Sequence, residues 1–331
     1  MRLNHTHVIA LANQKGGCGK STAAISLAAA FTKLGYSAAL VDIDPQCNTT
    51  DHLGLDRDAH AEQGGLSLAD VYLAGVPATE VQTFVPPWVD EETPDANPVP
   101  GGERGIRPWI VPGNRGLGTV EKRLEADMQA SAASPLDADE LRDAHRRRLR
   151  DSLDSLRGVH DFIIIDTPPE LGFLMTTALI AADWLLIPTF PSGYDMKGLT
   201  DLARTAEKVR HRFNPDLELI GVLLGNFNHV AKLDKDLYEN LKQTFGEGVL
   251  FETTINTSVR HREATVYNRT IFEHAPNQPA SKQFAQVAGE LLGRIEAWET
   301  ERAATGRPQL TINQDVIARH TNPEQPEAAC A

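Results

Sequence analysis

Short runs of apolar residues alternate along the chain with longer segments whose apolar residues recur at helical spacing. The runs with the length and composition of strands are residues 7–12, 38–42, 109–111, 162–166, 184–188 and 217–224. Helical spacing is found over residues 21–34, 139–156, 172–182, 196–213 and 233–245. This alternation is typical of parallel strands that are joined by helical crossovers.

The predicted sheet is buried on both faces. Residues 162–165 read Phe-Ile-Ile-Ile, without the polar alternation of a strand that has one face in water. Helices should therefore cover both faces. We predict a doubly wound, mostly parallel α/β sheet in one domain over residues 1–300.

Two segments do not follow this pattern. Residues 86–107 are rich in proline and glycine and contain the acidic cluster 90–92, which predicts an irregular surface loop. Residues 301–331 contain Pro308, Pro323 and Pro326 and have no sustained apolar periodicity. They are predicted to form a C-terminal extension that is partly flexible.

The charge balance is acidic but uneven. The 331 residues include 32 Lys and Arg against 45 Asp and Glu, a net charge of −13. Residues 86–145 alone hold 12 acidic and 6 basic side chains, so the second half of the chain is close to balanced. Such a chain is not a tight, constitutive nucleic-acid binder, although a local basic patch remains compatible with it.

Cysteine content and the N-terminus point to a cytoplasmic protein. The three cysteines, Cys18, Cys47 and Cys330, are too few and too scattered for a disulfide framework. Residues 1–7 have no apolar signal core, and no apolar stretch is long enough to cross a membrane.

A phosphate-binding loop is the strongest chemical feature. Residues 13–22 read Asn-Gln-Lys-Gly-Gly-Cys-Gly-Lys-Ser-Thr and lie between the first predicted strand and a helix. Glycines let the backbone fold around a phosphate, and the helix supplies free N–H groups and a positive dipole end. The alternative, a glycine-rich turn with incidental lysines, fits this strand–loop–helix context poorly. The predicted nucleotide-binding residues are Lys15, Gly16, Gly17, Cys18, Gly19, Lys20, Ser21 and Thr22.

Within this loop, Lys20 is expected to reach the outer phosphates and Ser21 to offer its hydroxyl to Mg²⁺. Two carboxylates at strand ends complete the predicted site. Asp44 lies near the carboxyl end of the second strand, where it can orient a water for attack on a phosphate; the alternative is a turn-capping aspartate before Pro45. Asp166 ends a buried strand, where its charge is costly without a cation, so it is predicted to hold the Mg²⁺ shell.

These motifs resemble the ParA/MinD ATPases. The leading Lys15 in Lys-Gly-Gly-x-Gly-Lys-Ser is similar to the deviant Walker A motif of that family. Residues 42–48 resemble its D-x-D-P-Q-x-N motif, residues 161–166 its Walker B strand, and residues 259–264 its V-R-x-x-E-A segment. The resemblance covers roughly residues 7–295.

The resemblance implies a P-loop ATPase that uses ATP and Mg²⁺ and works as a homodimer. In such a sandwich dimer, Lys15 would reach the partner's nucleotide, which makes Lys15 catalytic together with Lys20 and Asp44. The family reads the base at positions that match Asn226 and Asn256. Asn256 replaces a proline that is usual there, and Asn226 could equally be an ordinary turn residue.

The resemblance also implies partners. Related partition ATPases bind double-stranded DNA nonspecifically and respond to a ParB-like centromere-binding protein, which would make this chain nucleoid-associated. The C-terminal end has no basic amphipathic helix like that of MinD, so membrane binding is not expected. The candidate DNA-binding residues are Arg204, Lys208, Arg210, Arg212, Arg260 and Arg262. A solvated helix face would explain the cluster from Arg204 to Arg212 equally well.

The predicted function is an ATP-dependent DNA-partition ATPase whose dimer leaves the nucleoid on hydrolysis. The alternative is a ParA-like ATPase that positions a protein cargo or microcompartment. A metabolic P-loop enzyme is less favoured, since no cysteine pair suited to an iron–sulfur cluster is present. Only about seven residues precede the first strand, so no helix-turn-helix operator domain is expected there.

Overall fold

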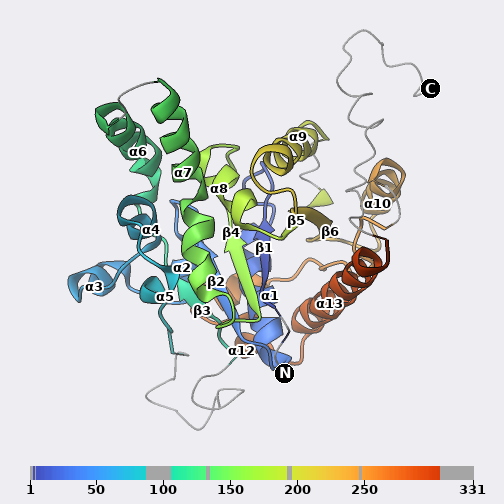
Figure 1. The fold of residues 1–331 in the computed structure, drawn as a ribbon. Coiled ribbons are helices and arrows are strands. Elements are labelled where there is room, and N and C mark those ends of the chain that lie inside the picture. The colour runs from blue at the N-terminus through green and yellow to red at the C-terminus, as the bar shows by residue number, and fades with distance from the viewer. Residues whose placement is uncertain are drawn as a thin grey trace, which may run out of the picture.

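A single parallel sheet forms the centre of the computed structural model, which describes residues 3, 5–86, 106–131, 135–191, 196–245 and 248–305 (Figure 1). Among these residues the sheet has six strands in the order β3-β2-β4-β1-β5-β6. All neighbouring strands are parallel, which confirms the predicted fold class. The strands are β1 (His7–Leu11), β2 (Ala38–Asp42), β3 (Trp109–Val111), β4 (Phe162–Asp166), β5 (Trp184–Thr189) and β6 (Glu218–Leu224).

Helices connect the strands and extend beyond those that the sequence predicts. The five predicted helical segments correspond to α1, α7, α8, α9 and α10, with ends that differ by a few residues. The helices are α1 (Lys20–Lys33), α2 (Asn48–His52), α3 (Arg57–Glu62), α4 (Leu68–Ala74), α5 (Ala78–Val81), α6 (Leu117–Ser131), α7 (Pro135–Leu153) with the 3₁₀ turn η2 (Asp154–Leu156), α8 (Phe173–Ala181), α9 (Met196–Arg212), α10 (Lys232–Phe245), α11 (Arg260–Val266), α12 (Ile271–His274) and α13 (Pro279–Thr305).

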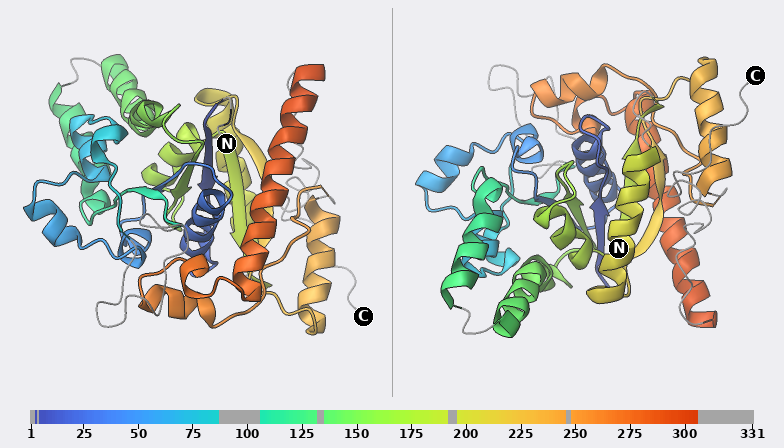
Figure 2. Two further views of the ribbon diagram at one scale, coloured as in Figure 1. Left: turned by 90° about the horizontal axis from the view of Figure 1, so that it is seen from below. Right: turned by 90° about the horizontal axis from the view of Figure 1, so that it is seen from above.

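The sheet is covered on both faces, as predicted (Figure 2). In β1, Val8 and Ala10 face a core that is shared with α4, α6, α7, α8 and α9. Ile9 and Leu11 face the opposite core, which is formed with α1, α12 and α13. All of these β1 side chains are buried, so the central strand has no wet face.

Helix α1 lies close to the sheet because small residues line its buried side. Its 14 residues include Ala23, Ala24, Ala28, Ala29 and Ala30, all buried. The residue before the helix, its N-cap, is Gly19, whose φ of 87° is left-handed and suits glycine. The chain therefore reverses at the carboxyl end of β1 and directs the N-terminus of α1 toward that edge of the sheet.

The two predicted irregular segments fall mainly outside the described residues. These are 87–105 of the predicted 86–107 loop and 306–331 of the predicted extension. The last two loop residues are described, and both Ile106 and Arg107 are buried rather than at the surface. Helix α13 continues to Thr305, beyond the predicted domain boundary at residue 300.

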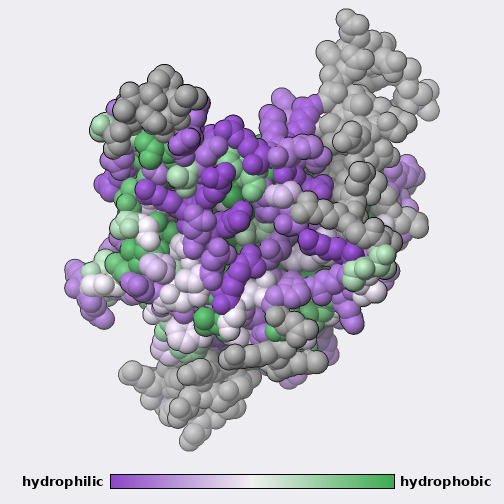
Figure 3. Space-filling model, viewed as in Figure 1, coloured by the Kyte–Doolittle hydropathy of each residue, from purple (hydrophilic) through white to green (hydrophobic). Residues whose placement is uncertain are grey.

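The view in Figure 3 shows a largely hydrophilic face, with hydrophobic residues in small groups over α4 and α6. Within the part of the chain that the structure describes, every helix is too short or too polar to cross a membrane.

Arg107 is held by a buried ion pair that links three distant segments. Its Nε donates to Glu273 Oε1 of α12 at 2.9 Å, and Nη1 donates to the carbonyl of Leu53 at 2.9 Å. A further bond joins Nη2 to the carbonyl of Asn268. Both side chains of the pair are almost fully buried, so removing one partner would leave an uncompensated charge in the interior.

We expect Arg107→Ala to lower the free energy of unfolding by about 3–5 kcal/mol, measured by urea denaturation. Arg142→Ala is the matched control, because Arg142 forms an exposed pair with Asp139. That control should cost less than about 1 kcal/mol. If both variants lose the same free energy of unfolding, the buried Arg107 pair stabilises the fold no more than an exposed pair does.

Candidate nucleotide site

The loop between β1 and α1 is folded around the amine of Lys20. Lys20 Nζ donates to the carbonyl oxygens of Asn13 at 3.1 Å and Lys15 at 3.2 Å. Asn13 Nδ2 in turn donates to the carbonyl of Pro188 in β5 at 2.7 Å. Gly17 and Gly19 have left-handed φ angles of 73° and 87°, which explains why these two positions are glycine. This is the conformation expected of a loop that presents N–H groups and a lysine to a phosphate.

Asp166 lies directly below this loop. It ends β4, is fully buried, and pairs in register with Asp42 at the end of β2. Its Oδ2 accepts from Thr49 Oγ1 at 2.7 Å, and the Ser21 hydroxyl also hydrogen-bonds to the carboxylate. Its Oδ1 has no partner among the described residues. A buried carboxylate oxygen beside a serine hydroxyl is a fitting arrangement for a magnesium shell.

Asp42 is a second buried carboxyl group that sequence reasoning did not assign to the site. Its Oδ2 accepts from the backbone N–H and the hydroxyl of Thr50, at 2.8 and 2.6 Å. Burial, and then the charge of Asp166, raises the pKa of Asp42 from 3.8 to about 8. Burial also raises the pKa of Asp166, while Ser21, Thr49 and Lys20 oppose the rise. Burial and their mutual proximity thus disfavour the charged form of both carboxyl groups.

The position of Asp44 is compatible with both interpretations of the sequence, a turn-capping aspartate and a catalytic one. Its Oδ1 accepts from the backbone N–H of Gln46 at 2.9 Å, which is the turn contact. It also lines a cavity of about 1020 Å³ at the carboxyl edge of the sheet. The capping interpretation and the catalytic one therefore do not exclude each other.

The cavity brings together most of the predicted nucleotide-binding residues. Its walls include residues 16–22, Asp44, Asn226, Asn256 and Arg262. Asn226 has a left-handed φ of 49°, so it is also a turn residue. Asn256 Oδ1 is buried without a partner among the described residues, as is fitting for a group that meets a ligand. Lys15 is exposed and is not among the described residues that line the walls.

Phe190 is a cavity residue that sequence reasoning missed. It follows β5, and its ring lies against both Gly19 and Gly225. A Cβ atom on Gly19 would approach the ring to 2.8 Å, and one on Gly225 to 2.7 Å. Its position directly after a buried strand at the carboxyl edge was the one available signal.

The candidate DNA-binding residues fall into two groups. Helix α9 packs on one face of the sheet, whereas α11 lies beside α12 on the other (Figure 2). On α9, Lys208 is exposed, and each arginine of this group lies near an acidic partner. These pairs are Arg204 with Asp201 (3.5 Å), Arg210 with Glu218 (3.1 Å) and Arg212 with Asp143 (2.9 Å).

On α11, Arg260 pairs with Glu263 at 2.7 Å, and Arg262 lines the cavity. One chain therefore does not join the six residues into a continuous patch.

Sequence comparisons place the chain among known proteins. Residues 6–219 match a family described as an AAA domain. The chain is 30% identical over 296 residues to the chromosome partitioning protein ParA of Caulobacter vibrioides, covering 89% of this chain and 97% of that protein. It is 33% identical to the chromosome-partitioning ATPase Soj of Thermus thermophilus, covering 87% and 96%. The chain belongs to the ParA/Soj family.

Solved structures agree with a ParA/Soj fold. A cobyrinic acid a,c-diamide synthase from Mycobacterium smegmatis, solved with ADP and magnesium, is 25% identical and superposes with a TM-score of 0.66 over 88% of this chain and 96% of that one. The Cyanothece McdA(D38A)–ATP complex gives 0.66 at 18% identity, covering 87% and 96%. MinD from Pyrococcus furiosus gives 0.58 at 19%, covering 87% and 98%. The last two show the fold alone.

The buried Asp42 of this ParA/Soj protein makes stability depend on pH. Because its pKa is raised on folding, the folded chain holds a proton that the unfolded chain has lost, and stability falls as pH rises toward 8. We expect the contribution of Asp42 to the free energy of unfolding in EDTA to drop by roughly 1–2 kcal/mol between pH 6 and pH 8. Burial lowers the pKa of His160 and His261 to about 4, and these groups act in the opposite direction.

Asp42→Asn should remove this contribution, which is measured as the difference in the free energy of unfolding between parent and variant in urea at each pH. The same change at Asp58, an exposed carboxyl group of α3, should leave it as in the unaltered protein. If Asp42→Asn and the parent have the same pH dependence, Asp42 does not make this contribution.

Proposed function

We propose that this protein is an ATP-dependent DNA-partition ATPase. The observation that carries the proposal is the convergence of Lys20, Asp44 and Asp166 at one edge of the sheet, with Lys15 outside the cavity walls. ParA and Soj relatives of matching length support the assignment to partition. The proposed ligands are ATP and Mg²⁺, consistent with the ADP and magnesium of the M. smegmatis structure.

Each residue of the proposed nucleotide site has a separate role. The loop N–H groups and Lys20 bind the outer phosphates, because backbone dipoles and an ammonium group meet them there. Ser21 and Asp166 hold Mg²⁺, which neutralises charge on the transferred phosphoryl group when bound. Asp44 orients the attacking water from the cavity wall. Asn226 and Asn256 contact the base.

Lys15 makes the site dependent on a second copy of the chain. Its backbone is engaged in the loop, through its carbonyl to Lys20 and its N–H to Asn13 at 3.0 Å, while its exposed side chain lies outside the walls. In a face-to-face homodimer this lysine reaches the partner's nucleotide and compensates charge there. Hydrolysis is then slow in the monomer and rises on dimerisation.

Replacement of Lys15 by alanine should abolish ATP-dependent dimerisation and lower ATP turnover at least about tenfold, because a charge-compensating residue in trans is lost. Phosphate release and analytical ultracentrifugation with and without ATP measure the two effects. Lys122→Ala on α6 is the control for loss of an exposed lysine. If Lys15→Ala dimerises and turns over ATP normally, the proposed mechanism is wrong.

DNA binding is proposed for the dimer. Arg260 and Arg262 of α11 stand next to the cavity, so a nucleotide-driven change in the dimer can alter how they are presented. Arg204 and Lys208 of α9 can add phosphate contacts, whereas Arg210 and Arg212 are engaged by Glu218 and Asp143. Two weak patches in one dimer bind duplex phosphates by avidity, without reading sequence.

In this proposal, a ParB-like centromere-binding protein stimulates hydrolysis and releases the dimer from nucleoid DNA. Membrane binding is not part of the cycle.

Arg260→Ala should weaken binding of the ATP-bound protein to duplex DNA and reduce the dependence on salt, by about one to two counterions per dimer. Fluorescence anisotropy at several salt concentrations measures both. Arg142→Ala is matched to it, since each arginine is half exposed and pairs with an acid three residues away. Affinity and salt slope that stay unchanged in Arg260→Ala would exclude α11 as the DNA surface.

The alternative, a ParA-like ATPase that positions a protein cargo or microcompartment, keeps the same dependence on Lys15. It differs in what stimulates turnover. For partition, ATP hydrolysis rises most when duplex DNA and the product of a neighbouring ParB-like gene are added together. For positioning, a cargo adaptor encoded nearby replaces them.

A further inference from the structure

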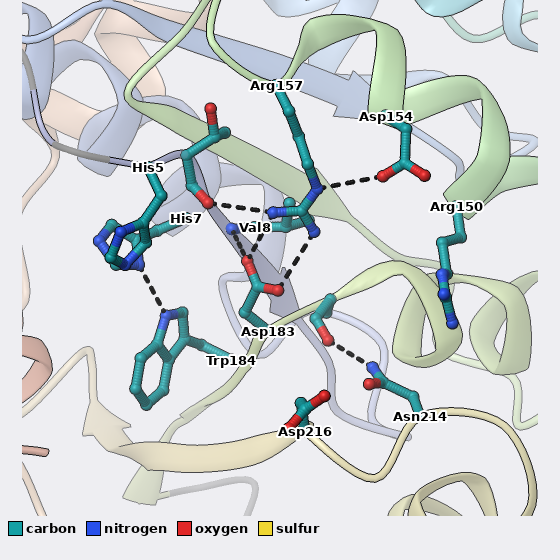
Figure 4. A network of polar contacts seen from close by, with 12 residues as sticks. His5, His7, Val8, Arg150, Asp154, Arg157, Asp183, Trp184, Asn214 and Asp216 are labelled. Carbon is teal, nitrogen blue, oxygen red and sulfur yellow. Dashed lines mark hydrogen bonds and ion pairs between the residues drawn. The ribbon is translucent and has the colours of Figure 1, made fainter. Parts of the chain in front are cut away.

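Two histidines face each other at the edge of the sheet opposite to the nucleotide cavity. His7 begins β1, the strand that runs into the phosphate loop, and His5 precedes it by two residues. The imidazole rings are 4.7 Å apart at 62° (Figure 4). This edge is remote from the carboxylates that the proposed function uses.

A carboxylate from the end of the chain joins this pair. Glu299 of α13 brings Oε1 to 2.5 Å from His5 Nε2 and to 3.8 Å from His7 Nε2. Helix α13 is fixed here because Trp298 packs edge-on against Trp184, with ring centres 4.9 Å apart. One donor atom from each of His5, His7 and Glu299 lies within 4.8 Å of the others. Residues nearly 300 apart in sequence thus converge on one point.

We propose that His5, His7 and Glu299 bind one divalent transition-metal ion of the zinc class. Two imidazole nitrogens and one carboxylate oxygen are a donor set for Zn²⁺, Co²⁺ or Ni²⁺, whereas Mg²⁺ prefers oxygen ligands. Around tetrahedral zinc, with bonds of about 2.0–2.1 Å, donor atoms stand roughly 3.3 Å apart. The separations of 2.5 and 3.8 Å fall on either side of this value.

The surroundings of the three residues leave room for an ion and for a water ligand. The cation Arg157 lies close by, but Asp183 and Asp154 pair with it at 3.2 and 3.1 Å. His5 is exposed, and a cavity of about 590 Å³ adjoins the three ligands. A fourth position is therefore open to water.

Trp184 provides an internal reporter. Its indole N–H donates to His7 Nδ1 at 3.3 Å (Figure 4). An ion on Nε2 of the neutral ring requires the proton on Nδ1, which would then face the indole N–H. Ion binding must therefore displace this hydrogen bond and change the environment of Trp184.

The test is titration of ZnCl₂ into the full chain, purified without a polyhistidine tag, stripped with EDTA and held in excess Mg²⁺. Calorimetry should give one Zn²⁺ per chain with a Kd of about 1 µM or lower, and tryptophan fluorescence should change in parallel. His5→Gln and Glu299→Gln should each weaken binding at least about tenfold. Both positions are partly exposed, so the variants should melt at the same temperature as the parent in EDTA.

His211→Gln and Glu207→Gln are the matched controls, because these residues form another exposed His–Glu pair, on α9, at 3.7 Å. The controls should bind Zn²⁺ as the parent does. The proposal is overturned if the parent does not bind, if His5→Gln and Glu299→Gln bind like the controls, or if binding leaves tryptophan fluorescence unchanged. Each of these readouts is independent of ATP turnover, so failure of the metal site leaves the proposed partition function untouched.

Discussion

Buried charge at the carboxyl edge of the sheet is the constraint on which the rest of this structure depends. Lys20, Asp42 and Asp166 lie together, each with little or no surface exposed to solvent. Charges in such surroundings are tolerated only when they are paired, hydrogen-bonded or neutralised by a proton. The loop carbonyls around Lys20, the threonines of α2 and the raised pKa of Asp42, which favours its neutral form, meet that requirement. The helices that cover both faces of the sheet keep these groups buried.

Much of the fold follows from local sequence. Continuous apolar runs such as 162–165 identify parallel strands, and the glycines and lysines before α1 identify the phosphate loop. The place of the Phe190 ring, the raised pKa of Asp42 and the contact between Glu299 and His5 depend on residues that meet only after folding. Helices α2 to α5 have too few turns for periodicity to reveal them. The small residues of α13 weaken its pattern in the same way, although it has 27 residues.

Charge along the sequence is a poor guide to charge at the surface. Arg210 and Arg212 are neighbours of Lys208 in sequence, but Glu218 of β6 and Asp143 of α7 engage them from other elements. Arg212 also packs over the ring of Phe213, with 5.1 Å to its centre. A run of basic residues on one helix therefore overstates the charge that a polyanion would meet. The pair of Arg260 with Glu263 can open more readily than that of Arg210 with Glu218, because both of its partners are partly exposed.

The position of Phe190 links the two ends of the cavity. Its ring lies so close to Gly19 of the phosphate loop and to Gly225 beyond β6 that a Cβ atom on either glycine would approach it to 2.8 or 2.7 Å. A side chain at one glycine would therefore have to displace the ring. The phosphate loop and the turn after β6 are thus coupled through one aromatic side chain, although they are distant in sequence.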